Sequence, residues 1–215
     1  MKAFKLTLVL LALLSSTACV TGTRNLQNLE IPEHSSDKSA AGSVFIGPIA
    51  DKRGFEQKPK DPSTPSVKGD LSSVTAEKRA TLIGRQRNGY GKAMGDVALP
   101  VGVTVQDKMH ALLKTGLESR GYTVVDDANA ETRVAVDINE FWAWFSPGFV
   151  SVSFESKLQS DLSFASASGK KSISVSGYGL NKGQVASDAN WELAFKRAFQ
   201  NFLENLDKLL DESGL

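Results

Sequence analysis

Residues 132–164 read TRVAVDINEFWAWFSPGFVSVSFESKLQSDLSF. Apolar side chains alternate with mostly polar ones on both sides of the turn signal Ser146-Pro147-Gly148. The alternating apolar positions are Val134, Val136, Ile138, Trp142 and Trp144 before the turn, and Val150, Val152, Phe154, Leu158, Leu162 and Phe164 after it. A period of two is typical of a strand with one buried face. The stretch therefore predicts a long antiparallel β-hairpin.

The same pattern continues beyond the Ser168-Gly169-Lys170 turn. Ile173 and Val175 keep the alternation, and from Gly177 onward the apolar positions shift to Tyr178 and Leu180. A change of phase inside a strand is what a β-bulge produces. We therefore expect a third strand with a bulge at Gly177.

Two segments have the spacing of amphipathic helices. The first opens at Thr104, with Asp107 placed for a capping box, and ends at Gly121; the second opens at Ser187 or Asp188. Their apolar stripes are Val105, Met109, Leu112, Leu113 and Leu117, and Trp191, Phe195, Ala198, Phe199, Phe202, Leu206 and Leu210. Each stripe must be buried against another element, and a sheet face is the natural partner.

Shorter strands are expected at 43–49, 80–84, 96–99 and 122–125, with an Asn88-Gly89 turn between the second and third. The resulting order predicts an α+β fold. It consists of an antiparallel-dominated sheet with a long β-hairpin, packed by one internal and one C-terminal amphipathic helix.

The N-terminus has the features of an export signal. Lys2 and Lys5 precede a short apolar run, and small residues lead to Cys19, the single cysteine of the chain. The apolar run is too short to span a bilayer as a helix. The stretch Ser16-Thr17-Ala18-Cys19 resembles the lipobox of bacterial lipoproteins, which implies removal of residues 1–18 and acylation of Cys19. An ordinary signal peptide with an incidental cysteine is the alternative.

Three further regions follow the signal peptide. Residues 19–41 lack a hydrophobic period and are expected to form a flexible tether from the lipidated cysteine. Residues 42–212 are expected to form a single periplasmic α+β domain. Within it, residues 51–74 carry three prolines and few apolar residues, so they are predicted to be a disordered insertion.

Composition excludes several classes of function. The chain has 25 basic and 24 acidic residues, a balance that argues against nucleic acid as a partner. Its two histidines, His34 and His110, lie far apart and give neither a catalytic pair nor a zinc site. Asp126-Asp127 lacks the spacing of a calcium loop. We therefore expect no enzyme activity, no metal and no cofactor.

Two stretches are candidate recognition surfaces. Arg85, Arg87 and Lys92 surround Tyr90 on a glycine-rich turn. This turn could meet an anionic lipid, a polysaccharide or an acidic partner, or it could be an ordinary solvated hairpin. Trp142, Trp144, Phe145 and Phe149 surround the tip of the long hairpin. Trp142 and Trp144 fall on the same alternating positions as Val134 and Val136, which favours burial in the core. Phe145 and Phe149 flank the turn, and this position favours a contact with a protein or a membrane.

From residue 103 onward the chain resembles the YajG-type family of uncharacterised bacterial outer-membrane lipoproteins. The resemblance rests on the helix end Leu117-Glu118-Ser119-Arg120-Gly121-Tyr122, on the hairpin 132–164 and on the closing helix. The family has no established activity, so the resemblance implies no site residue. Val20, where lipoproteins retained in the inner membrane typically carry Asp, suggests export to the outer membrane.

These observations predict an outer-membrane lipoprotein, lipid-anchored on the periplasmic face, that acts as a non-catalytic binding or accessory subunit of a cell-envelope assembly. Its partners would be the membrane, through Cys19, and an envelope protein. The alternative is a small-ligand or glycan-binding lipoprotein, and an envelope hydrolase using His110 or Asp127 is the third possibility.

Overall fold

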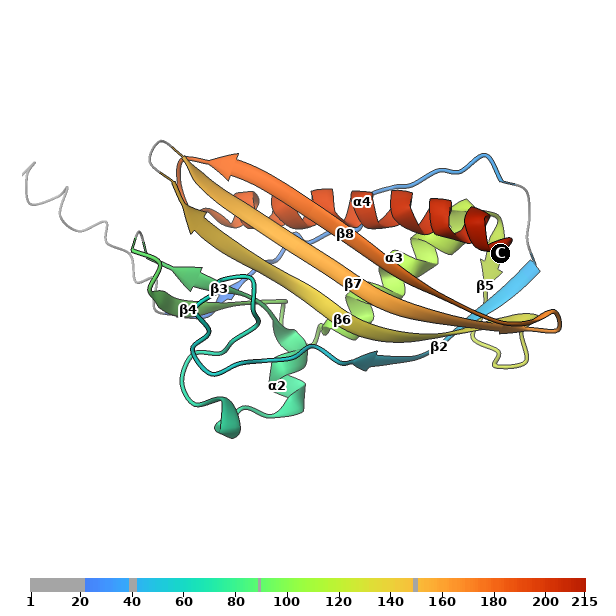
Figure 1. The fold of residues 1–215 in the computed structure, drawn as a ribbon, viewed down its shortest axis with the longest axis horizontal. Coiled ribbons are helices and arrows are strands. Elements are labelled where there is room, and N and C mark those ends of the chain that lie inside the picture. The colour runs from blue at the N-terminus through green and yellow to red at the C-terminus, as the bar shows by residue number, and fades with distance from the viewer. Residues whose placement is uncertain (1–21, 39–41, 89, 149–150) are drawn as a thin grey trace, which may run out of the picture.

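The computed structural model describes residues 22–38, 42–88, 90–148 and 151–215. The strands are β1 (Arg24–Asn25), β2 (Gly42–Asp51), β3 (Leu82–Arg87), β4 (Ala93–Ala98), β5 (Tyr122–Val124), β6 (Thr132–Pro147), β7 (Val152–Ser166) and β8 (Gly169–Gly183). The helices are the short 3₁₀ turn η2 (Leu71–Ser73), α2 (Ala76–Thr81), α3 (Val105–Ser119) and α4 (Asp188–Ser213). The three long strands β6–β8 form a twisted sheet, and α4 lies along one of its faces (Figure 1).

β6 organises the sheet. It pairs with β7 along its whole length, from Thr132–Ser166 to Pro147–Val152, which confirms the predicted long hairpin. Its other edge is shared, because β2 pairs with the first half of β6 and β3 with the second half. β5 then extends the sheet beyond β2, and β4 and β1 extend it beyond β3.

The prediction of an antiparallel-dominated sheet is wrong. Among the described strands, β1–β4, β2–β5, β2–β6 and β3–β6 are parallel pairs, and the other three pairs are antiparallel. Alternation of apolar residues marks a strand with a buried face but is the same for both pairing directions. Parallel partners are joined by long connections, so their pairing leaves no local signal in the sequence.

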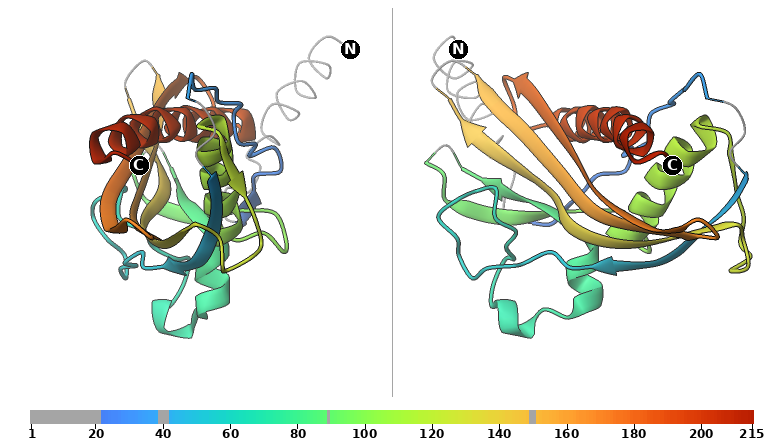
Figure 2. Two further views of the ribbon diagram at one scale, coloured as in Figure 1. Left: turned by 90° about the vertical axis from the view of Figure 1, so that its right-hand side faces the viewer. Right: turned by 45° about the vertical axis from the view of Figure 1, so that its right-hand side comes forward.

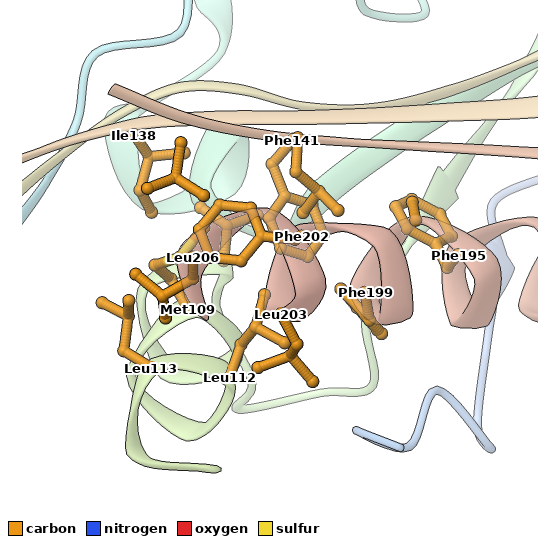
Figure 3. Close-up of a cluster of buried hydrophobic side chains, with 14 of the residues drawn as sticks. Met109, Leu112, Leu113, Ile138, Phe141, Phe195, Phe199, Phe202, Leu203 and Leu206 are labelled. Carbon is orange, nitrogen blue, oxygen red and sulfur yellow. The ribbon is translucent and has the colours of Figure 1, made fainter. Parts of the chain in front are cut away.

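Both predicted helices are confirmed, and their apolar stripes form the core. Thr104 caps α3 through the expected box, since the Thr104 amide donates to the Asp107 carboxylate and the Asp107 amide donates to the Thr104 hydroxyl. Ser187 caps the start of α4, and Gly214 ends it in a left-handed conformation. Phenylalanines and leucines of α4 meet the leucines of α3 and the side chains of Ile138 and Phe141 (Figure 3).

The predicted bulge at Gly177 is also wrong. The register between β7 and β8 is unbroken from Val152–Gly183 to Ser166–Gly169. Gly177 is buried, whereas Tyr178 and Leu180 point to solvent, because α4 leaves no room for a side chain at residue 177. The bulge instead lies in β6, where the register with β7 shifts between Ile138 and Glu140.

Two segments expected to lack structure are packed where the structure describes them. Leu26 and Leu29, within the expected tether, are buried in the main core. Arg53 and Val67, within the expected disordered insertion, are buried as well. Leu26, Leu29 and Val67 are isolated apolar residues and Arg53 is charged, so no hydrophobic period in the sequence marks these segments as ordered. Residues 19–21 and 39–41 of the expected tether lie outside the described residues.

Candidate functional site

The bulge in β6 decides which way the hairpin aromatics point. After it, Phe141 and Phe145 face the main core, where the Phe145 ring lies 5.6 Å from that of Phe154. Phe145 is 7% exposed and therefore does not project from the tip as its position suggested. Phe149, the second aromatic residue expected to project, lies outside the described residues.

Trp142 and Trp144 take the opposite face of β6. Trp142 is buried in a second apolar cluster with Val67, Leu82 and Ala98, and its indole N–H donates to the Pro62 carbonyl at 3.3 Å. Trp144 packs against the edge of this cluster and is partly buried. Trp142 thus secures the 51–74 stretch against the sheet and is not a free recognition surface.

The glycine-rich turn that contains Arg85, Arg87 and Tyr90 has both buried and exposed side chains. Arg85 is buried and pairs with Asp96 at 2.9 Å. Arg87 is partly buried and donates from Nη1 to the Gly91 carbonyl at 2.9 Å. Tyr90, 98% exposed, points to solvent beyond them. The three residues therefore do not form one exposed patch.

A pocket of about 590 Å³ lies where residues 58–67 cross the β3–β4 hairpin. Five of its lining residues are basic: Lys58, Lys60, Arg85, Arg87 and Lys92. The remaining lining residues are Pro59, Ser66, Val67, Gly91 and Ala93, so no carboxylate lines it. We call this the basic pocket, and its charge favours an anionic ligand.

The wall of the basic pocket holds buried polar atoms without a partner among the described residues. They are Nε and Nη2 of Arg87, Nε of Arg85 and Oγ of Ser66. A buried donor that makes no hydrogen bond costs free energy, and a charged donor costs more. An acceptor entering the pocket would remove that cost.

Arg53 in the same chain shows what these atoms can bind. Its Nε and Nη2 donate to the two carboxylate oxygens of Asp51, each at 2.8 Å. This edge of a guanidinium group is a fork that matches a carboxylate or a phosphate. Arg87 has the same edge buried and without a partner among the described residues, so its two nitrogens can donate to one such group.

The electrostatic surroundings of Arg85 and Arg87 also favour binding of an anion. Burial lowers the pKa of Arg85, and the Asp96 carboxylate opposes that effect. Burial also lowers the pKa of Arg87, the positive charge of Arg85 lowers it further, and Asp61 acts in the opposite direction. Arginine remains protonated in proteins, so both groups stay cationic and are stabilised by an entering anion.

A second pocket, of about 510 Å³, is lined by Arg53 and Asp51 among others, and its charge is already compensated. All five N–H groups of Arg53 donate to protein acceptors, namely the Asp51 carboxylate and the carbonyls of Arg79, Leu82 and Phe141. This guanidinium holds the protein together and has no donor left for a ligand.

The residues that could have supported catalysis are not brought together. His34 pairs with Asp207 at 2.8 Å, whereas His110 lies on α3 and Asp127 lies in the loop after β5. Within the described residues, no group of three or more His, Cys, Asp or Glu is placed to hold a metal ion. The chemistry available in the basic pocket is hydrogen bonding and charge.

The sequence pattern indicates Arg85, Arg87 and Lys92 but gives no indication of Lys58, Lys60 and Ser66. These three lie in the stretch predicted to be disordered, so they were not considered as part of a site. A lysine pair in a long connection between strands was the available signal, since long ordered loops often carry function.

The model of a family described as uncharacterised lipoprotein matches residues 85–208, which is more than half of the chain. The chain belongs to this lipoprotein family. The match includes both arginines of the basic pocket, the long hairpin and most of α4. No curated protein shows significant similarity to this member of the lipoprotein family.

Two solved structures match this lipoprotein over most of its length. Protein XCC0632 from Xanthomonas campestris, assigned to the family DUF330, has 12% sequence identity and a TM-score of 0.39, with 91% of this chain and 99% of that chain covered. The hypothetical protein CT253 from Chlamydia trachomatis has 9% identity and a TM-score of 0.39, with 79% and 96% covered.

Proposed function

We propose that this protein is a lipid-anchored envelope protein that binds an anionic ligand in the basic pocket and performs no catalysis. The observation that carries the proposal is the buried edge of Arg87, whose Nε and Nη2 have no acceptor among the described residues. A phosphate or carboxylate group fits this edge, and Lys58, Lys60 and Lys92 supply further positive charge around it.

The anchor is part of the proposal. Membership in a lipoprotein family agrees with a lipobox at Ser16-Thr17-Ala18-Cys19, and we take Cys19 to be acylated after removal of residues 1–18. None of the helices in the described part of the chain has the length and apolarity of a membrane span. A YajG-type relationship, an outer-membrane location and a periplasmic orientation complete the proposal, with Val20 as the sorting residue.

Mass spectrometry of the mature N-terminus tests the anchor. We expect an acylated Cys19, and we expect Cys19→Ala to give a soluble product or an uncleaved precursor. Separation of inner and outer membranes tests the location. Recovery of wild-type protein with an unmodified Cys19 would overturn the lipid anchor.

Calorimetry with inorganic phosphate tests anion binding, using the mature acylated protein in neutral detergent. Arg87→Gln should weaken binding by roughly tenfold or more, because it replaces a charged fork by one amide. Arg133→Gln is the matched control, since Arg133 is an exposed arginine on β6 outside the pocket. Wild-type protein that binds no phosphate, or an Arg87→Gln variant that binds as well as wild type, would contradict the proposal.

An accessory role beside an envelope protein partner stays a prediction. Val101 is an exposed apolar side chain outside the basic pocket that such a partner could contact. Crosslinking in intact cells through residue 101, followed by purification, tests it. A reproducible crosslink to one envelope protein would support the accessory role, and an absence of crosslinks would favour the ligand-binding role alone.

A further inference from the structure

The chain enters the described domain beside the basic pocket. The carbonyl oxygen of Gly22 accepts a hydrogen bond from Nε2 of Gln86 at 2.9 Å. Gln86 lies between Arg85 and Arg87 in β3, on the face opposite to the two arginine side chains. The first described residue is therefore fixed to the strand that supplies both arginines.

The segment that follows Gly22 is held against the protein over its length. Arg24 pairs with Asp188 at 2.6 Å, and the Leu26 amide donates to the Ala98 carbonyl at 2.9 Å. Leu26 and Leu29 are buried. Residues 22–29 therefore cannot act as slack between the domain and a lipid on Cys19.

The distance from the anchor to the pocket strand is short as a result. Cys19 precedes Gly22 by three residues, and three fully extended residues span at most about 11 Å. A lipid on Cys19 would hold β3 about one headgroup layer from the bilayer, whereas a free tether of residues 19–41 would have let the domain stand away from it.

The end of the molecule that carries Gly22 also carries the basic pocket. The end of β3 and the start of β4 lie there, together with the end of β6 and the start of β7 (Figures 1 and 2). β5, the turn between β7 and β8 and the C-terminus lie at the opposite end (Figure 1). Tyr90, almost fully exposed, extends from the first end beside Lys92, and aromatic and basic side chains favour a membrane interface.

We infer that the basic pocket faces the bilayer and takes the phosphate of an anionic lipid headgroup. The side chains of Lys58, Lys60 and Lys92 form no ion pair or hydrogen bond within the described residues, so their charge is available to the membrane surface. The unpartnered edge of Arg87 then provides two donors to the phosphate oxygens. Those nitrogens are buried in the wall of the pocket, so contact with the phosphate requires the lining side chains to move.

The anchor explains why the ligand is a lipid and not a soluble anion. A protein tethered within about 11 Å of a headgroup layer meets that headgroup at a high effective concentration. At such a concentration, weak individual contacts are sufficient to keep a headgroup bound in the pocket. The inference rests on the proposed acylation of Cys19 and on anion binding in the same pocket.

The first test asks which end of the protein faces the bilayer. It uses the acylated protein in vesicles of brominated phosphatidylcholine, because the bromine atoms quench a fluorescent label that lies close to the membrane. Because Cys19 is the single cysteine of the chain and is acylated, an introduced cysteine is the one free thiol for a fluorescent label. We expect strong quenching of a label at Tyr90→Cys and weak quenching at Ser168→Cys, an exposed position between β7 and β8. Equal quenching at the two positions, or stronger quenching at residue 168, would overturn the inference.

Headgroup selection is tested in nanodiscs of phosphatidylcholine mixed with phosphatidylglycerol. Native mass spectrometry of the released protein should show preferential retention of phosphatidylglycerol. Arg87→Gln and Lys92→Gln should each reduce this preference severalfold, and Arg133→Gln should leave it unchanged. Lys92 is exposed, so its variant tests binding without a risk to folding.

The outcomes separate the two proposals. If inorganic phosphate binds in detergent through Arg87 but phosphatidylglycerol is not preferred in nanodiscs, the pocket binds a soluble anion and the inference is wrong. If neither phosphate nor phosphatidylglycerol binds, the proposed function fails as well. If phosphatidylglycerol is preferred equally by wild type and by Arg87→Gln, the lipid lies elsewhere and the inference is overturned.

Discussion

Gly179 of β8 lies directly beneath Ala194 of α4, and a Cβ atom on residue 179 would lie 2.0 Å from the Ala194 carbonyl oxygen. The same holds two residues earlier in the strand, where a Cβ on Gly177 would lie 2.3 Å from the Ala198 carbonyl oxygen. The backbone of α4 thus lies on a groove of two glycines. The two glycines therefore allow the helix and the sheet to pack closely over the main core.

Gly179→Ala should therefore push α4 away from the sheet. The added methyl group meets backbone atoms, which cannot rotate aside, so we expect a loss of about 1–3 kcal/mol in the free energy of unfolding, the usual cost of overpacking. Denaturant unfolding measures it. Gly54→Ala is the control, because a Cβ on Gly54 has no neighbour within 4 Å. Equal stability of the two variants would show that α4 adjusts freely.

Arg53 should be among the most sensitive polar residues of the protein. Its side chain is fully buried and ties the end of β2 to β3 and β6. Arg53→Met leaves the Asp51 carboxylate and three carbonyls without their donor, so we expect a loss of about 3–5 kcal/mol. Arg133→Met, at an exposed arginine, should change stability by less than about 0.5 kcal/mol in the same denaturation experiment.

Phe145 should behave as a core residue although it lies near the hairpin turn. Its ring packs against Phe154, which in turn packs against Trp191. We expect Phe145→Ser to cost about 3 kcal/mol or more, measured by denaturant unfolding, because it empties an aromatic site and adds a buried hydroxyl. Tyr90→Ser removes an aromatic ring that is 98% exposed and should be nearly neutral. A neutral Phe145→Ser would restore the projecting position suggested by the sequence.

Trp142 should control the order of the 51–74 stretch. The indole contacts Phe55 edge-on at 5.8 Å between ring centroids and donates to Pro62. Trp142→Ala should therefore free this stretch and accelerate tryptic cleavage after Lys60 and Lys68 by about tenfold, since proteolysis follows the population of locally opened states. Rapid cleavage of wild type at the same two lysines would instead support the predicted disorder.

Tyr178 gives a pH dependence with a defined sign. Burial and the hydrogen bond to Glu155, at 2.6 Å, raise the pKa of Tyr178 from 10.0 to about 12. Because the unfolded chain ionises this phenol first, its contribution to stability is complete below pH 10.0 and is lost as the pH rises to about 12. Over this interval, wild type should lose more stability than Tyr178→Phe in parallel denaturation series. Identical losses would show that Tyr178 titrates normally.

The elements with a regular local pattern were predictable. The hairpin of β6 and β7 and the stripes of α3 and α4 follow from the spacing of apolar residues and from caps such as Thr104 and Ser187. Prediction failed where a single residue breaks the pattern or where contacts are distant. The bulge beside Asn139 reverses the faces of Trp142 and Phe145. The change of phase at Gly177 predicts a bulge, but the glycines of β8 instead accommodate a helix.

The candidate site was half predictable for the same reason. Arg85, Arg87 and Lys92 are recognisable as a group because they lie close together in the sequence. Lys58, Lys60 and Ser66 reach the same pocket from a stretch without any period, after a turn whose course is fixed by Trp142 and Asp96. No pattern in consecutive residues encodes that approach.

The sequence by itself predicted the export signal with Cys19, and it determined the lengths of the main strands and helices and their buried faces, because each of these depends on residues that are neighbours along the chain. The tertiary structure decided which strands pair in parallel, which aromatic side chains are buried, and that five basic residues from two distant segments line one pocket beside Gly22. These features depend on how separate elements pack, and packing is set by shape and hydrogen bonding between residues that are remote in sequence.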